Sequence, residues 1–157
     1  MPRRYVVLMT ALVAVVLTGI AVAGLQKNFS VHARGSSEVP AVVTNGQGQA
    51  IFQLSKDGTE LHYRLIVANI DEVFMAHIHL AAPGVNGLIA VWLYPSTAPA
   101  PGAPTGRVSG PIAEGVITAS DVQVGTFAGL LEALRTGNAY VNVHTTPNPG
   151  GEIRGNF

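Results

Sequence analysis

The chain has 157 residues, of which 48% are apolar and only 11% charged, with nine basic and nine acidic side chains. This length predicts one domain, and the lack of a basic excess argues against a nucleic-acid partner. No cysteine is present, which excludes disulfides and cysteine-linked lipid anchors. The 18 glycines and 10 prolines, with so few charges, favour an all-β domain of short strands.

The N-terminal segment 1–23 has the order of a secretory signal peptide. Basic residues at 3–4 precede an uncharged apolar run over 5–22, and Ala-Val-Ala at 21–23 forms a small-residue cleavage pattern. We expect cleavage before Gly24, after which seven basic and nine acidic residues remain. The alternative is an uncleaved membrane anchor, because the run is close to the ~18 residues that span a bilayer. Either way, the body is expected to be secreted, periplasmic or at the cell surface.

The first half of the exported part predicts a strand and a hairpin. Polar and apolar side chains alternate over 29–34, which is typical of a half-buried strand. A similar alternation runs over 49–54 and again over 61–67. The Asp57-Gly58 pair between the last two segments is a strong hairpin signal. We therefore predict one hairpin over 49–67.

The second half predicts further strands and a single helix. Four prolines interrupt 95–106, so a surface excursion is expected there. The helix is expected over 126–136, with Thr126 as its cap and Gly137 as its stop. The remaining strands are predicted at 74–80, 88–94, 108–117, 139–145 and 152–157.

Three of the five histidines lie in two of the predicted strands, 74–80 and 139–145. His77 and His79 are two residues apart, so they point to the same side of an extended strand, as does Met75. His144 lies in a second strand and would supply a third ligand if the two strands were neighbours. Imidazoles bind copper and zinc, and a thioether favours Cu(I). The sequence thus suggests a metal site of His77, His79 and His144, with Met75 as a further candidate.

A structural interpretation of these side chains remains open at this point. The histidines can equally be hydrogen-bonded groups beside a loop, with Met75 in the core. Glu152 and Arg154 share a face of the last strand and are expected to form a charge pair that ties it down. The alternative for this pair is recognition or support of His144.

Four other side chains are expected to have no role in a site. His32 and His62 lie on polar strand faces and are expected to be solvated. Trp92 and Tyr94 are expected in the core. No nucleophile elbow, placed carboxylate pair or phosphate-binding glycine loop is recognisable, so enzymatic activity is not expected.

Several motifs, in order, resemble the hallmarks of the CHRD domain, a module named after chordin that also occurs alone in exported bacterial proteins. The resemblance covers 29–157 and implies an extracellular β-sandwich of immunoglobulin-like or Greek-key type. It also suggests Glu38 as a partner of Arg154. The motifs are Glu38-Val39-Pro40, Ala76-His77-Ile78-His79, Asn86-Gly87, Tyr140-Val141-Asn142-Val143-His144-Thr145 and Gly151-Glu152-Ile153-Arg154-Gly155.

A narrower likeness concerns His77-Ile78-His79 and the distant His144, which together resemble the copper site of copper–zinc superoxide dismutases. No cysteine pair is present, and the short loop after His79 holds no residues for a zinc site, so only the metal is carried over. Our main interpretation is a non-catalytic binding or structural module for a protein or surface ligand. The alternatives are a copper or zinc protein, as carrier or redox site, and adhesion through 95–106.

Overall fold

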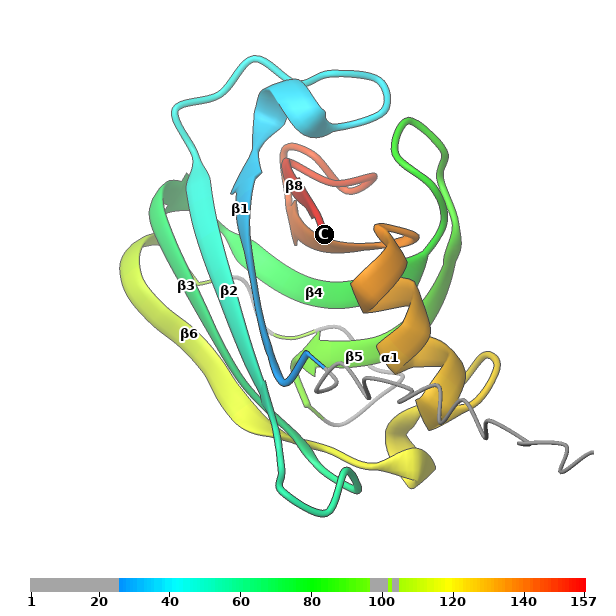
Figure 1. Ribbon diagram of the computed structural model, residues 1–157. Coiled ribbons are helices and arrows are strands. Elements are labelled where there is room, and N and C mark those ends of the chain that lie inside the picture. Colours follow the sequence, from blue (N-terminus) through cyan, green and yellow to red (C-terminus); the bar gives the residue numbers. More distant parts are fainter. Residues whose placement is uncertain (1–25, 97–101, 103–104) are drawn as a thin grey trace, which may run out of the picture.

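The computed structural model describes residues 26–96, 102 and 105–157 (Figure 1). The expected signal segment and most of the proline-rich excursion lie outside these residues. The strands are β1 (Asn28–Arg34), β2 (Gln47–Leu54), β3 (Leu61–Asp71), β4 (Val73–Leu80), β5 (Leu88–Tyr94), β6 (Arg107–Ile117), β7 (Ala139–Thr145) and β8 (Ile153–Asn156). The helices are α1 (Phe127–Thr136) and two 3₁₀ turns, η1 (Gly35–Ser37) and η2 (Ala119–Asp121).

All eight strands belong to one antiparallel sheet, in the order β5-β4-β7-β8-β1-β2-β3-β6. The sheet curls until its two edge strands, β5 and β6, approach each other without pairing (Figure 1). From β3, the strand beside β6, the Tyr63 hydroxyl reaches β5 and donates to the Leu93 carbonyl at 2.8 Å. The antiparallel all-β class is therefore confirmed. The sandwich implied by the resemblance has two sheets, whereas hydrogen bonding here links every strand into one nearly closed, barrel-like sheet.

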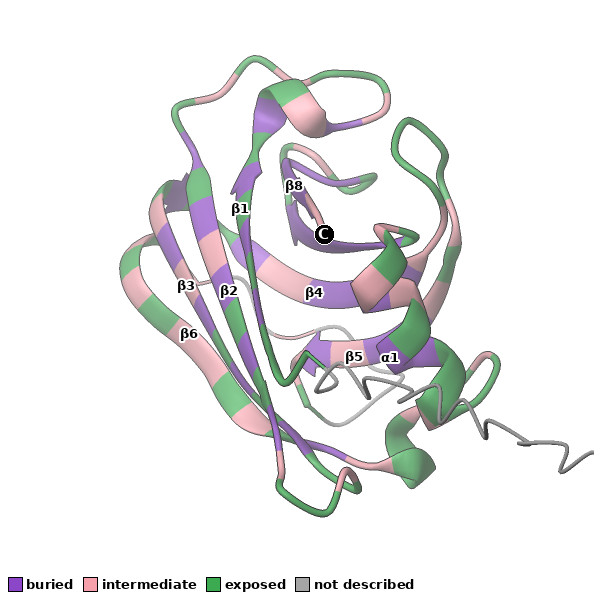
Figure 2. Cartoon of the chain, in the orientation of Figure 1, coloured by how far each residue is buried: buried purple, intermediate pink, exposed green. Residues whose placement is uncertain are grey.

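The predicted hairpin is confirmed as β2 and β3. The two strands pair from Leu54 and Leu61 at the turn to Gln47 and Ala68 at the far end. The Asp57 carboxylate accepts hydrogen bonds from the Ser55 hydroxyl and from the backbone and side chain of Thr59. Along β2, buried and solvent-facing residues alternate (Figure 2). This half of the sheet therefore has one solvent-exposed face and one face packed on the core.

The predicted helix is also confirmed, with Thr126 as its N-cap. The Thr126 hydroxyl accepts a hydrogen bond from the Gly129 backbone N–H at 3.0 Å, which satisfies one of the free donors of the first turn. Gly137 ends the helix in the left-handed region, at φ +73°. The buried face, made of Leu130, Leu131 and Leu134, packs into the core. Among the described residues, no helix is long and apolar enough to cross a membrane.

The middle of the sheet is buried differently from the hairpin. Every residue of β7 is buried, including Asn142 and His144, and β4 has four consecutive buried residues from Ala76 to His79 (Figure 2). The last strand starts one residue later and ends one residue earlier than expected, at Ile153 and Asn156. Because β4, β7 and β8 are neighbours, their polar side chains meet inside the protein.

Candidate metal centre

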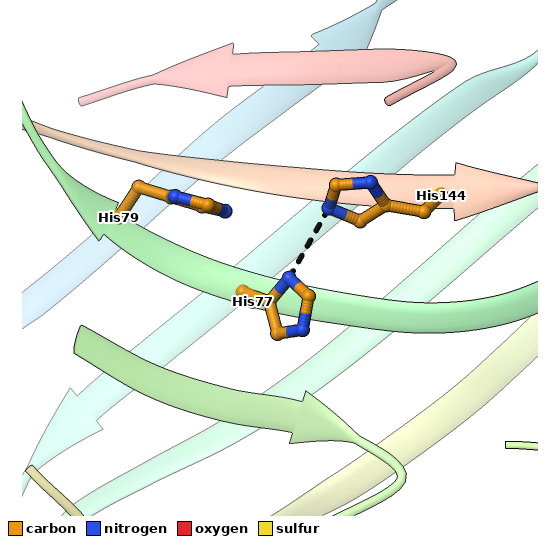
Figure 3. Close-up of side chains that lie close together, drawn as sticks. All are labelled: His77, His79 and His144. Atoms are coloured by element: carbon orange, nitrogen blue, oxygen red, sulfur yellow. Dashed lines mark hydrogen bonds between the residues drawn. The ribbon is translucent and has the colours of Figure 1, made fainter. Parts of the chain in front are cut away.

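The three histidines of the two strand motifs converge. Because β4 and β7 pair directly, His77 lies opposite Asn142 and His79 opposite Tyr140. One ring nitrogen from each of His77, His79 and His144 lies within 4.8 Å of the others. Within this group, His77 Nδ1 and His144 Nε2 lie 3.1 Å apart and are hydrogen-bonded to each other (Figure 3). The predicted convergence is confirmed, and this 3.1 Å separation is close to what two ligands of one tetrahedral ion require.

Two backbone carbonyls orient two of the rings. His79 Nδ1 lies 3.0 Å from the Gly87 carbonyl, and His144 Nδ1 lies 3.0 Å from the Pro149 carbonyl. A carbonyl only accepts, so each Nδ1 carries the proton when the ring is neutral. The Nε2 atoms are left with lone pairs. Metal-bound histidines in proteins are held in this way, with the second ring nitrogen donating to a carbonyl or carboxylate.

Two ring nitrogens of the cluster are buried and have no hydrogen-bond partner, namely Nε2 of His77 and Nε2 of His79. Buried polar atoms are normally paired, so each unpaired one asks for an explanation. For His79, the free atom is the one that carries the lone pair and points towards His144 in Figure 3. A metal ion bound between the rings would satisfy this nitrogen.

Burial keeps the cluster uncharged at neutral pH. Loss of solvent, together with the neighbouring rings of His144 and His79, lowers the pKa of His77 to about 3. Burial also lowers the pKa of His144 to about 4, although the bond to Pro149 acts in the opposite direction. The pKa of His79 is lowered by the same cause. Neutral imidazole is the form that binds metal, so no proton has to leave first.

Two aromatic rings border the histidines. Trp92 lies opposite His77 on β5, with ring centroids 4.2 Å apart and nearly perpendicular planes. Trp92 is half-buried but does not pack against the buried core, so the core prediction was wrong for this residue, whereas the equally half-buried Tyr94 does pack against the core. Tyr140 stacks on His79, with centroids 4.8 Å apart and planes within 5°. The signal for Tyr140 was its position two residues before Asn142, on the His144 face.

The charge pair expected between Glu152 and Arg154 does not form. Neither side chain lies within 4.0 Å of an opposite charge in the described residues. Glu152 instead accepts hydrogen bonds from Thr44, Thr145 and Asn148. Arg154 turns towards β7 and the loop 81–87. The two residues therefore fasten different parts of the structure, and the pairing prediction was wrong.

Glu38 lies near Arg154 but is held by Asn142. The Asn142 side-chain amide donates to both carboxylate oxygens of Glu38, at 2.9 and 3.1 Å. Burial raises the pKa of Glu38 to about 6, while Asn142 and the positive charge of Arg154 limit the rise. The partnership suggested by the resemblance is thus electrostatic and not a direct ion pair.

Of the remaining candidate side chains, one lies beside the cluster and two lie on the surface. Met75 lies directly opposite His144 in the β4–β7 register, on the face of the cluster, and is half-buried. His32 and His62 are exposed, and His62 lies 3.3 Å from the carboxylate of Glu60. Their predicted solvated positions are confirmed. Among the described residues, the cluster therefore offers three nitrogen donors and no carboxylate ligand, with a methionine opposite His144 in register, a set that suits copper and zinc better than calcium or magnesium.

Comparison with known proteins gives one result. Residues 29–157 match the family model of the CHRD domain, which covers nearly the whole chain and confirms the resemblance drawn from the motifs. No curated protein and no solved structure matches the chain.

Proposed function

We propose that this protein, which belongs to the CHRD domain family, binds a copper or zinc ion through His77, His79 and His144. The observation that carries the proposal is the orientation of the rings. Backbone carbonyls orient the rings of His79 and His144, the Nε2 atom of His144 lies 3.1 Å from Nδ1 of His77, and the Nε2 atom of His79 points towards His144 and has no other partner. The proposal assigns binding, in a carrier or structural role, and no reaction.

Metal binding accounts for the burial of these side chains better than a purely structural role does. Burying polar groups without partners costs free energy, and a structural role would reward complete hydrogen bonding. Here the Nε2 atom of His79, a residue that is 9% exposed, is buried and left unpaired beside two other imidazoles. A bound ion would turn the cost of burying this atom into a ligand bond.

The test is titration of Cu(I), Cu(II) and Zn(II) against competing chelators. We expect His79→Ala to weaken binding at least about a hundredfold, because even the outer hydrogen-bond partners of metal ligands contribute 10–100-fold. The matched control is His62→Ala, which removes an exposed histidine from β3 and should bind as the wild type does. Equal, weak binding by all three proteins would reject the metal site and leave the non-catalytic binding module as the better interpretation.

We also propose that the domain acts outside the cytoplasm, as a secreted, periplasmic or surface protein. The support is that residues 1–23 begin with basic residues, continue with an apolar run and end in small residues, as secretory signal peptides do. Intact-mass measurement of protein from its native envelope should give a chain that begins at or near Gly24. Recovery of the full-length chain in the membrane fraction would instead indicate an anchor.

A further inference from the structure

Arg154 brings a permanent positive charge into the protein interior. The residue is 0% exposed. Its side chain donates from Nε to Asn156 at 3.0 Å, from Nη1 to Asn86 at 3.2 Å and from Nη2 to the Val85 carbonyl at 2.9 Å. All three acceptors are neutral, and a guanidinium does not lose its proton in proteins. The positive charge is therefore hydrogen-bonded but not neutralised by a contacting carboxylate.

The Arg154 guanidinium is linked to the histidine cluster by stacked aromatic rings. The Arg154 guanidinium carbon lies 3.4 Å from the centre of the Tyr140 ring. On Tyr140 stacks His79, with the two rings nearly parallel. The guanidinium, the phenol ring and the imidazole thus form one stack, and these separations leave no room for water between stacked partners. The field of Arg154 therefore reaches the cluster through protein and not through solvent.

The cluster itself contributes no compensating charge. Its three ligand candidates are neutral imidazoles, so a bound ion would keep its full charge inside the protein. Repulsion by a fixed cation grows in proportion to the charge of the ion. Glu38 lies near Arg154 and offsets part of its positive charge, but it is held by Asn142 and makes no ion pair with the guanidinium, while Glu152 is held by threonine and asparagine side chains. A divalent ion would therefore be disfavoured more than a monovalent one.

We propose that Arg154 biases the histidine site towards the monovalent ion Cu(I) and against the divalent ions Zn(II) and Cu(II). This inference rests on the proposed metal-binding function and adds the residue that selects the ion. Met75 supports the same choice, because it lies opposite His144 in register and thioethers prefer Cu(I). Arg154 acts through Tyr140 and the electric field, so it is a specificity-determining residue and not a ligand.

Two variants change this charge by different routes. Arg154→Gln removes the cation. Asn156→Asp leaves the arginine in place and sets a carboxylate against its Nε, where the present side-chain oxygen already accepts a hydrogen bond. The second variant keeps the packing and adds an ion pair, so it remains informative if the first does not fold. Arg64→Gln is the control, because it removes the same charge from an exposed position on β3.

The measurement is the ratio of Zn(II) to Cu(I) affinity, from chelator competition, together with the potential of bound copper. A unit charge at roughly 10 Å, with an effective dielectric constant of about 20, changes an equilibrium on the order of tenfold. We therefore expect both variants to raise the ratio about tenfold and to lower the Cu(II)/Cu(I) potential by about 60 mV. The control should leave both quantities unchanged.

The outcomes separate this inference from the function on which it rests. If the wild type binds none of these ions, the metal site fails and the selectivity fails with it. If the wild type binds metal but Asn156→Asp leaves the ratio and the potential unchanged, the metal site stands and the role of Arg154 is overturned. A folded Arg154→Gln protein with an unchanged ratio would lead to the same conclusion.

Discussion

The β2–β3 hairpin and the β4–β7 pair are both antiparallel, yet they bury different side chains. In the hairpin, solvent-facing and buried positions alternate, and the histidine of β3, His62, is exposed. In β7 every position is buried, and the polar residues Asn142 and His144 lie inside. Burial of polar groups costs free energy, whereas apolar burial stabilises the fold. The hairpin therefore contributes mainly to the stability of the fold, whereas burying the polar side chains of the β4–β7 pair lowers stability and forms the candidate site.

Added metal should stabilise the β4–β7 region more than any other change tested. At a free metal concentration of a thousand times the dissociation constant, binding to the native state alone contributes about 4 kcal/mol. For a domain of this length, that corresponds to a rise in melting temperature of about ten degrees. Calorimetry of wild type and His144→Ala, with and without Zn(II) or Cu(I), checks it. The same rise in both proteins would contradict the site.

Truncation in the hairpin should cost stability and leave the site intact. Leu65 on β3 is 0% exposed, and Leu65→Ala should reduce the free energy of unfolding by about 3 kcal/mol, since the transfer and cavity terms add. Urea denaturation measures this loss. Metal affinity of the folded variant should equal that of the wild type. A parallel fall in affinity would show that the two regions are not separable in the way their burial patterns indicate.

Substitution of two glycines, one beside the site and one in the hairpin turn, should also differ in its cost to stability. Gly151, at φ +126°, adjoins β8, and an added Cβ would collide with the Asn142 side chain and lie 2.7 Å from Glu38. Gly58, at φ +78°, lies in the hairpin turn with open space around it. We expect Gly151→Ala to cost about 2–3 kcal/mol and Gly58→Ala about 1 kcal/mol, because only the first adds a collision to the backbone strain. Equal losses in thermal unfolding would contradict this.

Local patterns predicted the local elements and half of the site. Period-two alternation and Asp57-Gly58 determine the hairpin, and the spacing of His77 and His79 determines that they share a face. These features depend on residues close in sequence. Convergence with His144 required the pairing of β4 with β7, which the sequence allowed but did not specify.

The remaining features depend on contacts between distant segments. The single sheet exists because β1 lies between β8 and β2, an arrangement for which no local pattern codes. Arg154 stacks on Tyr140 because β8 pairs with β7, and the expected partner Glu152 is used by other side chains. Trp92 has an apolar neighbourhood in sequence, but its place opposite His77 comes from the β4–β5 register.

The smallest effect expected is that of pH on metal affinity. Three histidines with the ordinary pKa of 6.5 would lose about a thousandfold in apparent affinity by pH 5.5, because each must give up a proton before binding. In this cluster the pKa of His144 is about 4 and that of His77 about 3, and that of His79 is also lowered. Protons therefore compete with metal at His77 and His144 only at lower pH, so these two rings should contribute almost no loss between pH 7.5 and 5.5, and His79 should contribute less than an ordinary imidazole.

Glu38 should account for the modest loss that remains. Its pKa is about 6, so it becomes neutral over the same interval and removes a negative charge near Arg154 and the site. Affinity should therefore fall as pH falls, by less than about tenfold, and Glu38→Gln should flatten the profile because its side chain does not titrate. Zinc competition at pH 7.5, 6.5 and 5.5, corrected for protonation of the chelator, measures both effects. A thousandfold loss in the wild type would mean that the three rings titrate as solvated imidazoles, and the burial that distinguishes β4 and β7 from the hairpin would then not govern the site.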